Sequence, residues 1–301
     1  MKERAQVFFH ELQDEICSTL ERVDARGKFI EDAWTYAPGD GPGDGGGRSR
    51  VLAGGAVFEK AGVNVSALHG ELSPRLVERL EVTDRKFFAT GVSLVIHPES
   101  PLVPTAHMNL RYLQLFDAAG DPARAWFGGG ADLTPYYPDE EAAVLFHAAL
   151  KDACEPYAPD AYERFKRACD EYFYLPHRGE ARGIGGIFFD YLDEDPQRTF
   201  ELVRRVGTAF NAVYPEIVEH RKARRWTDTQ RDWQLHRRGR YVEFNLIHDR
   251  GTLFGLETKG RTESILMSLP PLVRWTYAHT PRPGSPEARL LEVLRAPRDW
   301  I

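Results

Sequence analysis

Two stretches of the chain alternate polar and apolar residues with the period of a β-strand, in which every second side chain points to the same face. In residues 88–97 one face carries Ser93 and His97, with Val95 between them. In residues 107–116 the corresponding polar face is the set His107, Asn109 and Arg111. If the two strands are neighbours in one sheet, these faces line a single pocket that can bind anions, protons or metal ions.

Further strands and helices follow from the same kind of pattern. Strand-like runs lie at 51–58, 88–97, 107–116, 123–128, 186–191, 240–248 and 252–257. The first helix is amphipathic from Phe8 to Val23 and is expected to end with Gly27 as its C-cap. Four later helices are expected to begin at Asp139, Pro159, Pro196 and Thr227, the last ending near Arg238.

The order of these elements predicts the fold class. Strands cluster in the first half and return late, which favours an antiparallel α+β sheet of about seven strands over alternating βαβ units. The runs 240–248 and 252–257 are predicted to form a hairpin with Asp249 in its turn. No repeat or composition break divides the chain, so a single domain over residues 1–301 is expected.

Charge and composition exclude several classes of protein. The net charge of −6 argues against a general affinity for nucleic acid. The three cysteines form no close pair, so neither a disulfide framework nor a thiolate metal site is predicted. We find no signal or transit peptide and no apolar run of membrane-spanning length, so a soluble cytoplasmic protein is expected. The glycine-rich segment 38–50 is interpreted as a surface loop, with a lid over the pocket as the second interpretation.

Charged residues beside glycines and turns are further candidates for chemistry. Arg111, on the polar strand face, is the best candidate for binding a carboxylate, because a guanidinium can donate two parallel hydrogen bonds to it. Arg178 and Arg182 either bind an anion or form a solvated pair with Glu180.

Two aspartates and four histidines leave alternatives open. Asp132 follows three glycines, 128–130, which either allow a close backbone approach to a ligand or make a plain turn. Asp249 either takes part in chemistry or bonds its own backbone at a turn. The histidines in suggestive contexts either converge on a metal ion or are structural, and they lack the close spacing of a local metal motif: His97, His107, His147 and His177.

Five blocks of the sequence resemble one family: residues 126–135, 177–190, 239–256, 262–271 and 294–300. The family is the oxygen-dependent coproporphyrinogen III oxidase of haem biosynthesis, and the chain looks like its soluble bacterial form. The resemblance spans nearly the whole chain and implies a homodimer whose large antiparallel sheet is flanked on both sides by helices. It also implies oxidative decarboxylation of two propionates of coproporphyrinogen III to vinyl groups. That reaction gives protoporphyrinogen IX, releases two CO2 and consumes two O2.

The resemblance also implies roles for individual residues. Arg111 looks like the arginine that holds a propionate, Asp249 like the aspartate that accepts pyrrole N–H bonds and helps deprotonate the substrate, and His107 like the proton donor. The implied substrate-binding positions are Ser93, Asn109, Leu110, Arg111, Asp132, Lys259, Gly260 and Arg261. At Lys259 the chain departs from the bacterial pattern, which often has glycine there. No organic cofactor is expected, and a divalent metal such as manganese is implied at the matching positions His97, His107, His147 and His177.

Segment 241–276 is expected to build much of the dimer interface, because its run of apolar residues exceeds what one hairpin face needs. Two other functions fit parts of the sequence. A non-catalytic tetrapyrrole carrier needs the same pocket and arginines but no proton donor, and it releases no CO2 with or without oxygen. A four-histidine metal-dependent hydrolase would lose activity on chelation and would not need oxygen.

Overall fold

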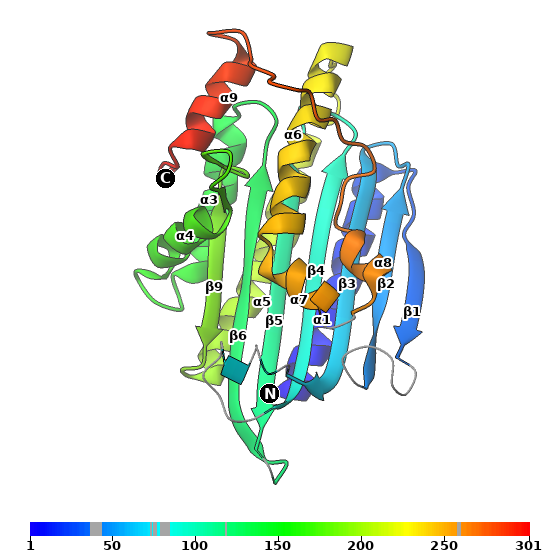
Figure 1. Ribbon diagram of the computed structural model, residues 1–301, viewed down its shortest axis with the longest axis vertical. Helices are drawn as coiled ribbons and strands as arrows, with labels where there is room; N and C mark the ends of the chain where they lie inside the picture. The colour runs from blue at the N-terminus through cyan, green and yellow to red at the C-terminus, as the bar shows by residue number, and fades with distance from the viewer. Residues whose placement is uncertain (37–43, 73, 75–76, 79–84, 118, 258–259) are drawn as a thin grey trace.

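The computed structural model describes residues 1–301 apart from 37–43, 73, 75–76, 79–84, 118 and 258–259 (Figure 1). Its central feature is a seven-stranded sheet in the order β1-β2-β3-β4-β5-β6-β9, in which every neighbouring pair is antiparallel. The strands are β1 Ile30–Thr35, β2 Gly45–Ala53, β3 Phe58–Glu71, β4 Lys86–Pro98, β5 Thr105–Phe116, β6 Pro122–Thr134 and β9 Gly186–Leu192. Two short strands, β7 Tyr174–Leu175 and β8 Glu180–Ala181, pair beside it.

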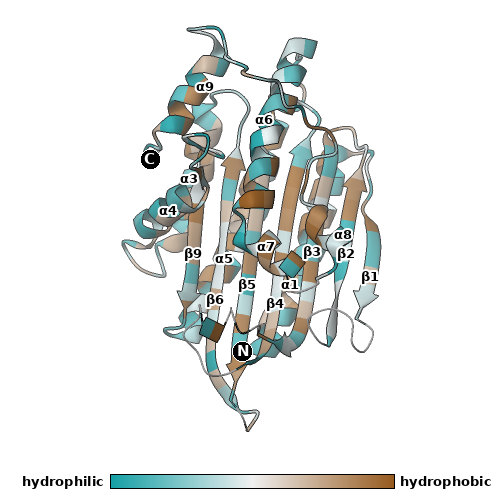
Figure 2. Ribbon diagram, in the orientation of Figure 1, coloured by the Kyte–Doolittle hydropathy of each residue, from teal (hydrophilic) through white to brown (hydrophobic). Residues whose placement is uncertain are grey.

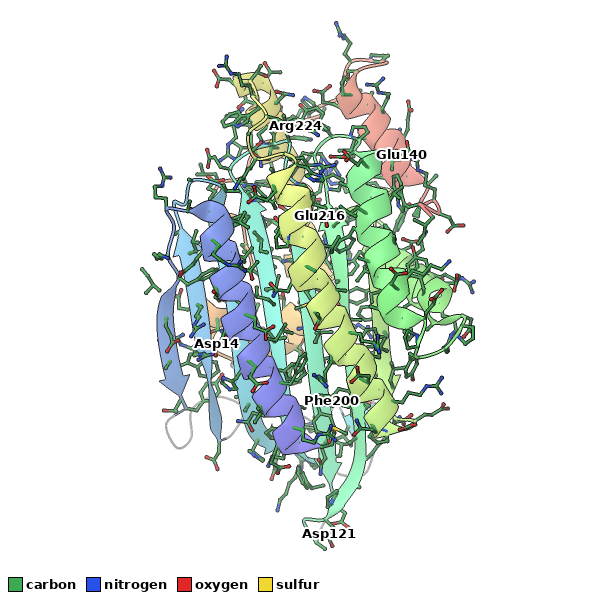
Figure 3. All side chains as sticks on the ribbon, turned by 180° about the vertical axis from the view of Figure 1, so that it is seen from behind. Asp14, Asp121, Glu140, Phe200, Glu216 and Arg224 are labelled. Atoms are coloured by element: carbon green, nitrogen blue, oxygen red, sulfur yellow. The ribbon has the colours of Figure 1, made fainter. Side chains whose placement is uncertain are left out.

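Helices cover both faces of the sheet. They are α1 Lys2–Asp24, α3 Glu140–Cys154, α4 Ala161–Tyr172, α5 Pro196–Glu219, α6 Asp228–Ile247, α7 Arg250–Glu257, α8 Thr262–Leu266 and α9 Pro286–Arg295. In Figure 1 α6, α7 and α8 cross the front of the sheet, and Figure 3 shows α1 and α5 along its back. The antiparallel α+β fold with helices on both sides is therefore confirmed. In the part of the chain that the structure describes, no helix is long and apolar enough to cross a membrane.

The large core lies between the back of the sheet and α1 and α5. Leu94, Met108 and Leu110 alternate with the polar residues of β4 and β5 and are buried in this core. Gly207 of α5 sits so close that a Cβ there would lie 2.6 Å from Leu12 of α1. The strands carry much of the hydrophobic colour in Figure 2. Because the apolar side chains of the central strands serve this core, their polar side chains are left for the front face.

The hairpin predicted for 240–248 and 252–257 is wrong. Residues 240–248 belong mostly to α6, and 252–257 belong to α7. The short alternation after Gly239 imitates a strand, but it continues a helix that a capping box opens at Thr227 and Gln230. Buried residues such as Arg237, Tyr241 and Phe244 recur at helical spacing along α6.

Three predicted boundaries also need correction. Run 51–58 is not one strand, because β2 ends at Ala53 and β3 begins at Phe58, after a turn in which Gly54 has φ +66°. In the glycine-rich segment 38–50, residues 45–50 lie in β2 rather than in a loop, and residues up to 43 lie outside the described part. The C-cap of α1 is Ala25, at φ 65°, and Gly27 instead donates its N–H to Asp24.

Candidate active site

The polar faces of the central strands line a cavity of about 410 Å³, and residues of α6, α7 and α8 line it as well. β4 and β5 are neighbours, as predicted, and Ser93 lies directly opposite Asn109. On the next strand pair His107 lies opposite Asp132, and Arg111 lies opposite Gly128. Cross-strand partners project from the same face, so these side chains meet in one cavity although they come from three strands.

One wall of the cavity is aromatic. Tyr172 and Phe188 stack with ring centroids 4.3 Å apart and an interplanar angle of 5°. Phe173 packs edge-on to both rings, and all three line the cavity. Such a wall suits a flat apolar ligand with polar groups at its rim.

A buried chain of polar groups extends from His107 into the protein. His107 Nδ1 and Asp132 Oδ1 are 2.7 Å apart. The guanidinium of Arg182 donates to both oxygens of Asp132, at 2.9 and 2.8 Å, and through its other terminal nitrogen to Asn245 Oδ1 of α6 at 2.9 Å. Since Nδ1 of His107 is held by Asp132, its Nε2 is the ring nitrogen left to face a ligand.

Arg182 and Asp132 are each only about 2% exposed, so their charges must balance each other. Burial by itself raises the pKa of Asp132, but the charge of Arg182 and the hydrogen bond from His107 outweigh it and lower that pKa. The cation also stacks on aromatic rings, with Cζ 4.1 Å from the centroid of Phe173 and 4.7 Å from that of Phe244. Asp132 therefore stays ionised and fixes the orientation of His107.

A second cluster places two guanidinium groups around one carboxylate. Arg111 Nη2 lies 2.8 Å from Asp190 Oδ2, and Arg250 Nη2 lies 3.7 Å from the same oxygen. Arg111 also donates to Asn109 Oδ1 at 2.9 Å. Two positive charges against one negative charge leave this end of the cavity suited to a further anion.

The three glycines of β6 make room for this cluster. They lie inside strand β6, so of the two alternatives left open by the sequence the plain turn is wrong. A Cβ at Gly128 would lie 2.5 Å from Asp190 Oδ1 and 2.8 Å from Arg111 Nη2. Any larger residue at position 128 would therefore displace the ion pair.

Asp249 lies where α6 ends and α7 begins, rather than at a hairpin tip. Its Oδ2 accepts the backbone N–H of Thr252 at 2.7 Å, which caps α7, and its Oδ1 accepts the Tyr172 hydroxyl at 2.9 Å. Burial and the nearby Asp249 charge raise the pKa of Tyr172 to about 12, so its hydroxyl keeps the proton it donates. A carboxylate has about four acceptor positions, so Asp249 can accept more hydrogen bonds from a ligand in the cavity it lines.

The structure brings three of the eight predicted substrate-binding residues to the lining of this cavity, together with the three residues predicted to be catalytic, of which Arg111 belongs to both sets. Its lining includes Ser93, His107, Asn109, Arg111 and Asp249. Asp132 lies directly behind His107.

Other members of the predicted set lie elsewhere. The Leu110 side chain points to the opposite face and is buried in the back core. Arg261 is paired with Asp32 of β1 at 2.5 Å and donates its backbone N–H to Tyr36. Gly260 donates its backbone N–H to Gly255, and Lys259 lies outside the described residues.

The four histidines are not gathered into one site. His97 is fully buried between the Ser268 carbonyl and the Thr105 hydroxyl, and burial lowers its pKa well below 6.5. His147 contacts Tyr162 and the Ile184 carbonyl. The other two histidines each contact a carboxylate: His177 contacts Glu243, and His107 contacts Asp132. Among the described residues no three histidine, cysteine, aspartate or glutamate side chains are grouped as a metal site requires. As the described residues are placed, these four histidines do not fit the implied joint metal site.

Several site residues were missed or misjudged in the sequence. Arg182 is not a solvated partner of Glu180, because it pairs with Asp132, while Glu180 pairs with Arg237. Arg178 pairs with Glu243. Asp190 and Asn245 were not singled out, although both lie in segments that carry the resemblance, and that was the only signal for them.

The comparison with protein families gives one match over nearly the entire chain. The model of the family described as coproporphyrinogen III oxidase matches residues 4–300. This match covers every strand of the sheet and every residue of the cavity.

Proposed function

The chain belongs to the coproporphyrinogen III oxidase family, and from this premise we propose that it uses O2 to convert two propionates of coproporphyrinogen III into vinyl groups, giving protoporphyrinogen IX. The family indicates an oxidoreductase of porphyrin biosynthesis that acts on a tetrapyrrole. The proposal adds the oxidant, the product and the residues that act on the substrate.

One observation carries the proposal: a guanidinium and a carboxylate with spare hydrogen-bonding capacity, Arg111 and Asp249, line the same cavity. A porphyrinogen has carboxylates at its rim and pyrrole N–H donors at its centre. Arg111 and Arg250 would hold a propionate, and Asp249 would accept pyrrole N–H bonds. The aromatic wall would contact the rings.

For each propionate the proposed reaction balances with one O2. The side chain loses CO2 and one hydrogen from its other methylene carbon, and a carbon–carbon double bond forms. The two electrons released pass to O2, which takes up two protons to give hydrogen peroxide, so that one proton is consumed overall. The reduced macrocycle is electron-rich, so the protein's tasks are positioning and proton transfer. His107, oriented by Asp132, is the residue we assign to proton transfer.

Incubation of the purified protein with coproporphyrinogen III under air and under argon tests the proposal. We expect CO2 release and a divinyl product under air, and neither under argon until O2 is admitted. Binding without CO2 release under either gas would instead identify a non-catalytic tetrapyrrole carrier. Oxygen-independent activity abolished by chelation would favour the hydrolase.

We also propose that the face carrying 241–276 joins two copies of the chain. Apolar side chains are unusually exposed there for an isolated subunit: Leu246 at 42%, Ile247 at 54%, Leu272 at 55% and Trp275 at 53%. Sedimentation over a dilution series should show a dimer, and monomer at every concentration would contradict this.

Replacing Arg111 by alanine should mainly weaken substrate capture. The substitution removes a charged donor to the propionate, and we expect KM to rise roughly 10–100-fold with a smaller change in kcat. Arg111→Lys keeps the charge but loses the planar guanidinium, and its KM should lie between those of the unaltered protein and Arg111→Ala. Initial rates over a range of substrate concentrations measure both constants. An unchanged KM would remove Arg111 from the binding site.

A further inference from the structure

The floor of the cavity changes from polar to apolar side chains just beyond Arg111. Leu113 lies two residues after Arg111 on β5. Ala89 of β4 and Trp126 of β6 lie opposite Leu113 on either side. Leu72 and Tyr191 also line this end of the cavity. The ring of Tyr191 lies 5.6 Å from that of Trp126. We call these five side chains the apolar step.

Among the described residues, the two arginines beside the apolar step are each already paired with a carboxylate. Arg111 donates to Asn109, which lies in the opposite direction along β5, and its other terminal nitrogen is held by Asp190 of β9. Arg124 lies over the Trp126 ring, with Cζ 5.3 Å from its centroid, and pairs with Asp193 at 3.0 Å. The polar groups that Trp126 and Tyr191 themselves bring are an indole N–H and a phenol hydroxyl, neither of which balances a full negative charge.

We propose that the apolar step is a specificity subsite, which accepts a methyl or newly formed vinyl group of the macrocycle and rejects a carboxylate in that place. This inference rests on the proposed function. Strand residues two apart are separated by roughly 7 Å, so the step begins one substituent away from the arginine that holds a propionate. An acetate at the methyl position would lose its water there, and within the described part of the chain the arginines beside it are already paired with carboxylates.

The test compares a porphyrinogen bearing four acetates in place of its four methyl groups with coproporphyrinogen III. The acetate compound is added as a competitor while CO2 release from coproporphyrinogen III is measured. For the unaltered protein we expect its inhibition constant to exceed the KM of the substrate at least roughly 100-fold, because a buried unpaired carboxylate is strongly disfavoured. Equal binding of the two compounds would overturn the subsite.

Leu113→Lys places a cation on the step and should tighten competitor binding about tenfold or more. Ile265→Lys is the matched control, because Ile265 of α8 lines the same cavity but not the apolar step. An equal gain in both variants would show a general charge effect and contradict the proposal. Thermal unfolding checks that each variant folds, and Ala89→Lys replaces Leu113→Lys if the latter does not.

The design separates the two levels of inference. If the unaltered protein releases CO2 but binds the acetate compound with the same affinity as its substrate, the proposed function is supported and the specificity subsite is contradicted. If it neither binds nor converts coproporphyrinogen III, the proposed function fails and the subsite falls with it.

Discussion

Replacing Asp249 by alanine should lower kcat roughly a thousandfold, within the range for loss of a group that handles protons at the reacting centre. Asp249 is the cavity carboxylate that we assign to the pyrrole N–H groups, and its two oxygens are oriented by Tyr172 and by the backbone of Thr252. Once the carboxylate is removed, the substrate nitrogens lose both their acceptor and the negative charge that stabilises positive charge developing in the ring.

The structural role of Asp249 has to be separated from its chemical role. Its side chain caps α7, so alanine also costs about 1 kcal/mol of stability through the lost cap. An asparagine at this position would keep the cap and the size of the side chain but not the charge. We therefore expect Asp249→Asn to unfold at nearly the same urea concentration as the unaltered protein and still to lose most of its turnover.

The measurements are steady-state CO2 release and urea unfolding followed by circular dichroism. A serine variant, which caps a helix well but carries no charge, should behave like the asparagine variant. Turnover in Asp249→Asn within a fewfold of the unaltered protein would show that the charge is not needed.

The floor of the site could be predicted because its signal is local. Ser93, Asn109 and Arg111 follow strand alternation within short segments, and a neighbouring pair of strands then brings them together. The same reasoning failed for 240–248, because these few residues fit the period of a strand as well as that of a helix. They are helical because they continue the helix that begins after Thr227.

The buried partners could not be predicted by local patterns. Arg182 lies in a polar, glycine-rich segment typical of a solvated loop. Its burial depends on Asp132, 50 residues earlier, and on Asn245, 63 residues later. No periodicity links such positions, so tertiary packing alone makes Arg182 part of the site.

Replacing Arg182 by methionine should be the most destabilising single change in the site. Methionine fills much of the space but leaves the Asp132 carboxylate buried without its cation. Breaking a buried pair in this way typically costs about 3–5 kcal/mol of unfolding free energy. Turnover should fall as well, because Asp132 no longer fixes His107.

Arg182→Met combined with Asp132→Asn is the matched control, since it removes both charges, and it should recover much of the lost stability.

The pH dependence of this loss has a definite sign. In the unaltered protein the folded pKa of Asp132 lies below the unfolded value of 3.8. Its contribution to stability is therefore present above pH 3.8 and is lost as pH falls through the folded pKa. Without Arg182 the charge that does most to lower this pKa is gone, and we expect burial to outweigh the remaining hydrogen bond from His107 and raise the folded pKa above 3.8. The ionised carboxylate would then destabilise the fold at neutral pH, and this penalty would shrink on acidification. Urea unfolding at about pH 7 and about pH 5 should accordingly show a smaller difference between Arg182→Met and the unaltered protein at the lower pH. In the Asp132→Asn background the pH dependence of that difference should disappear. A difference that grows on acidification would mean that Asp132 is not the charge Arg182 balances.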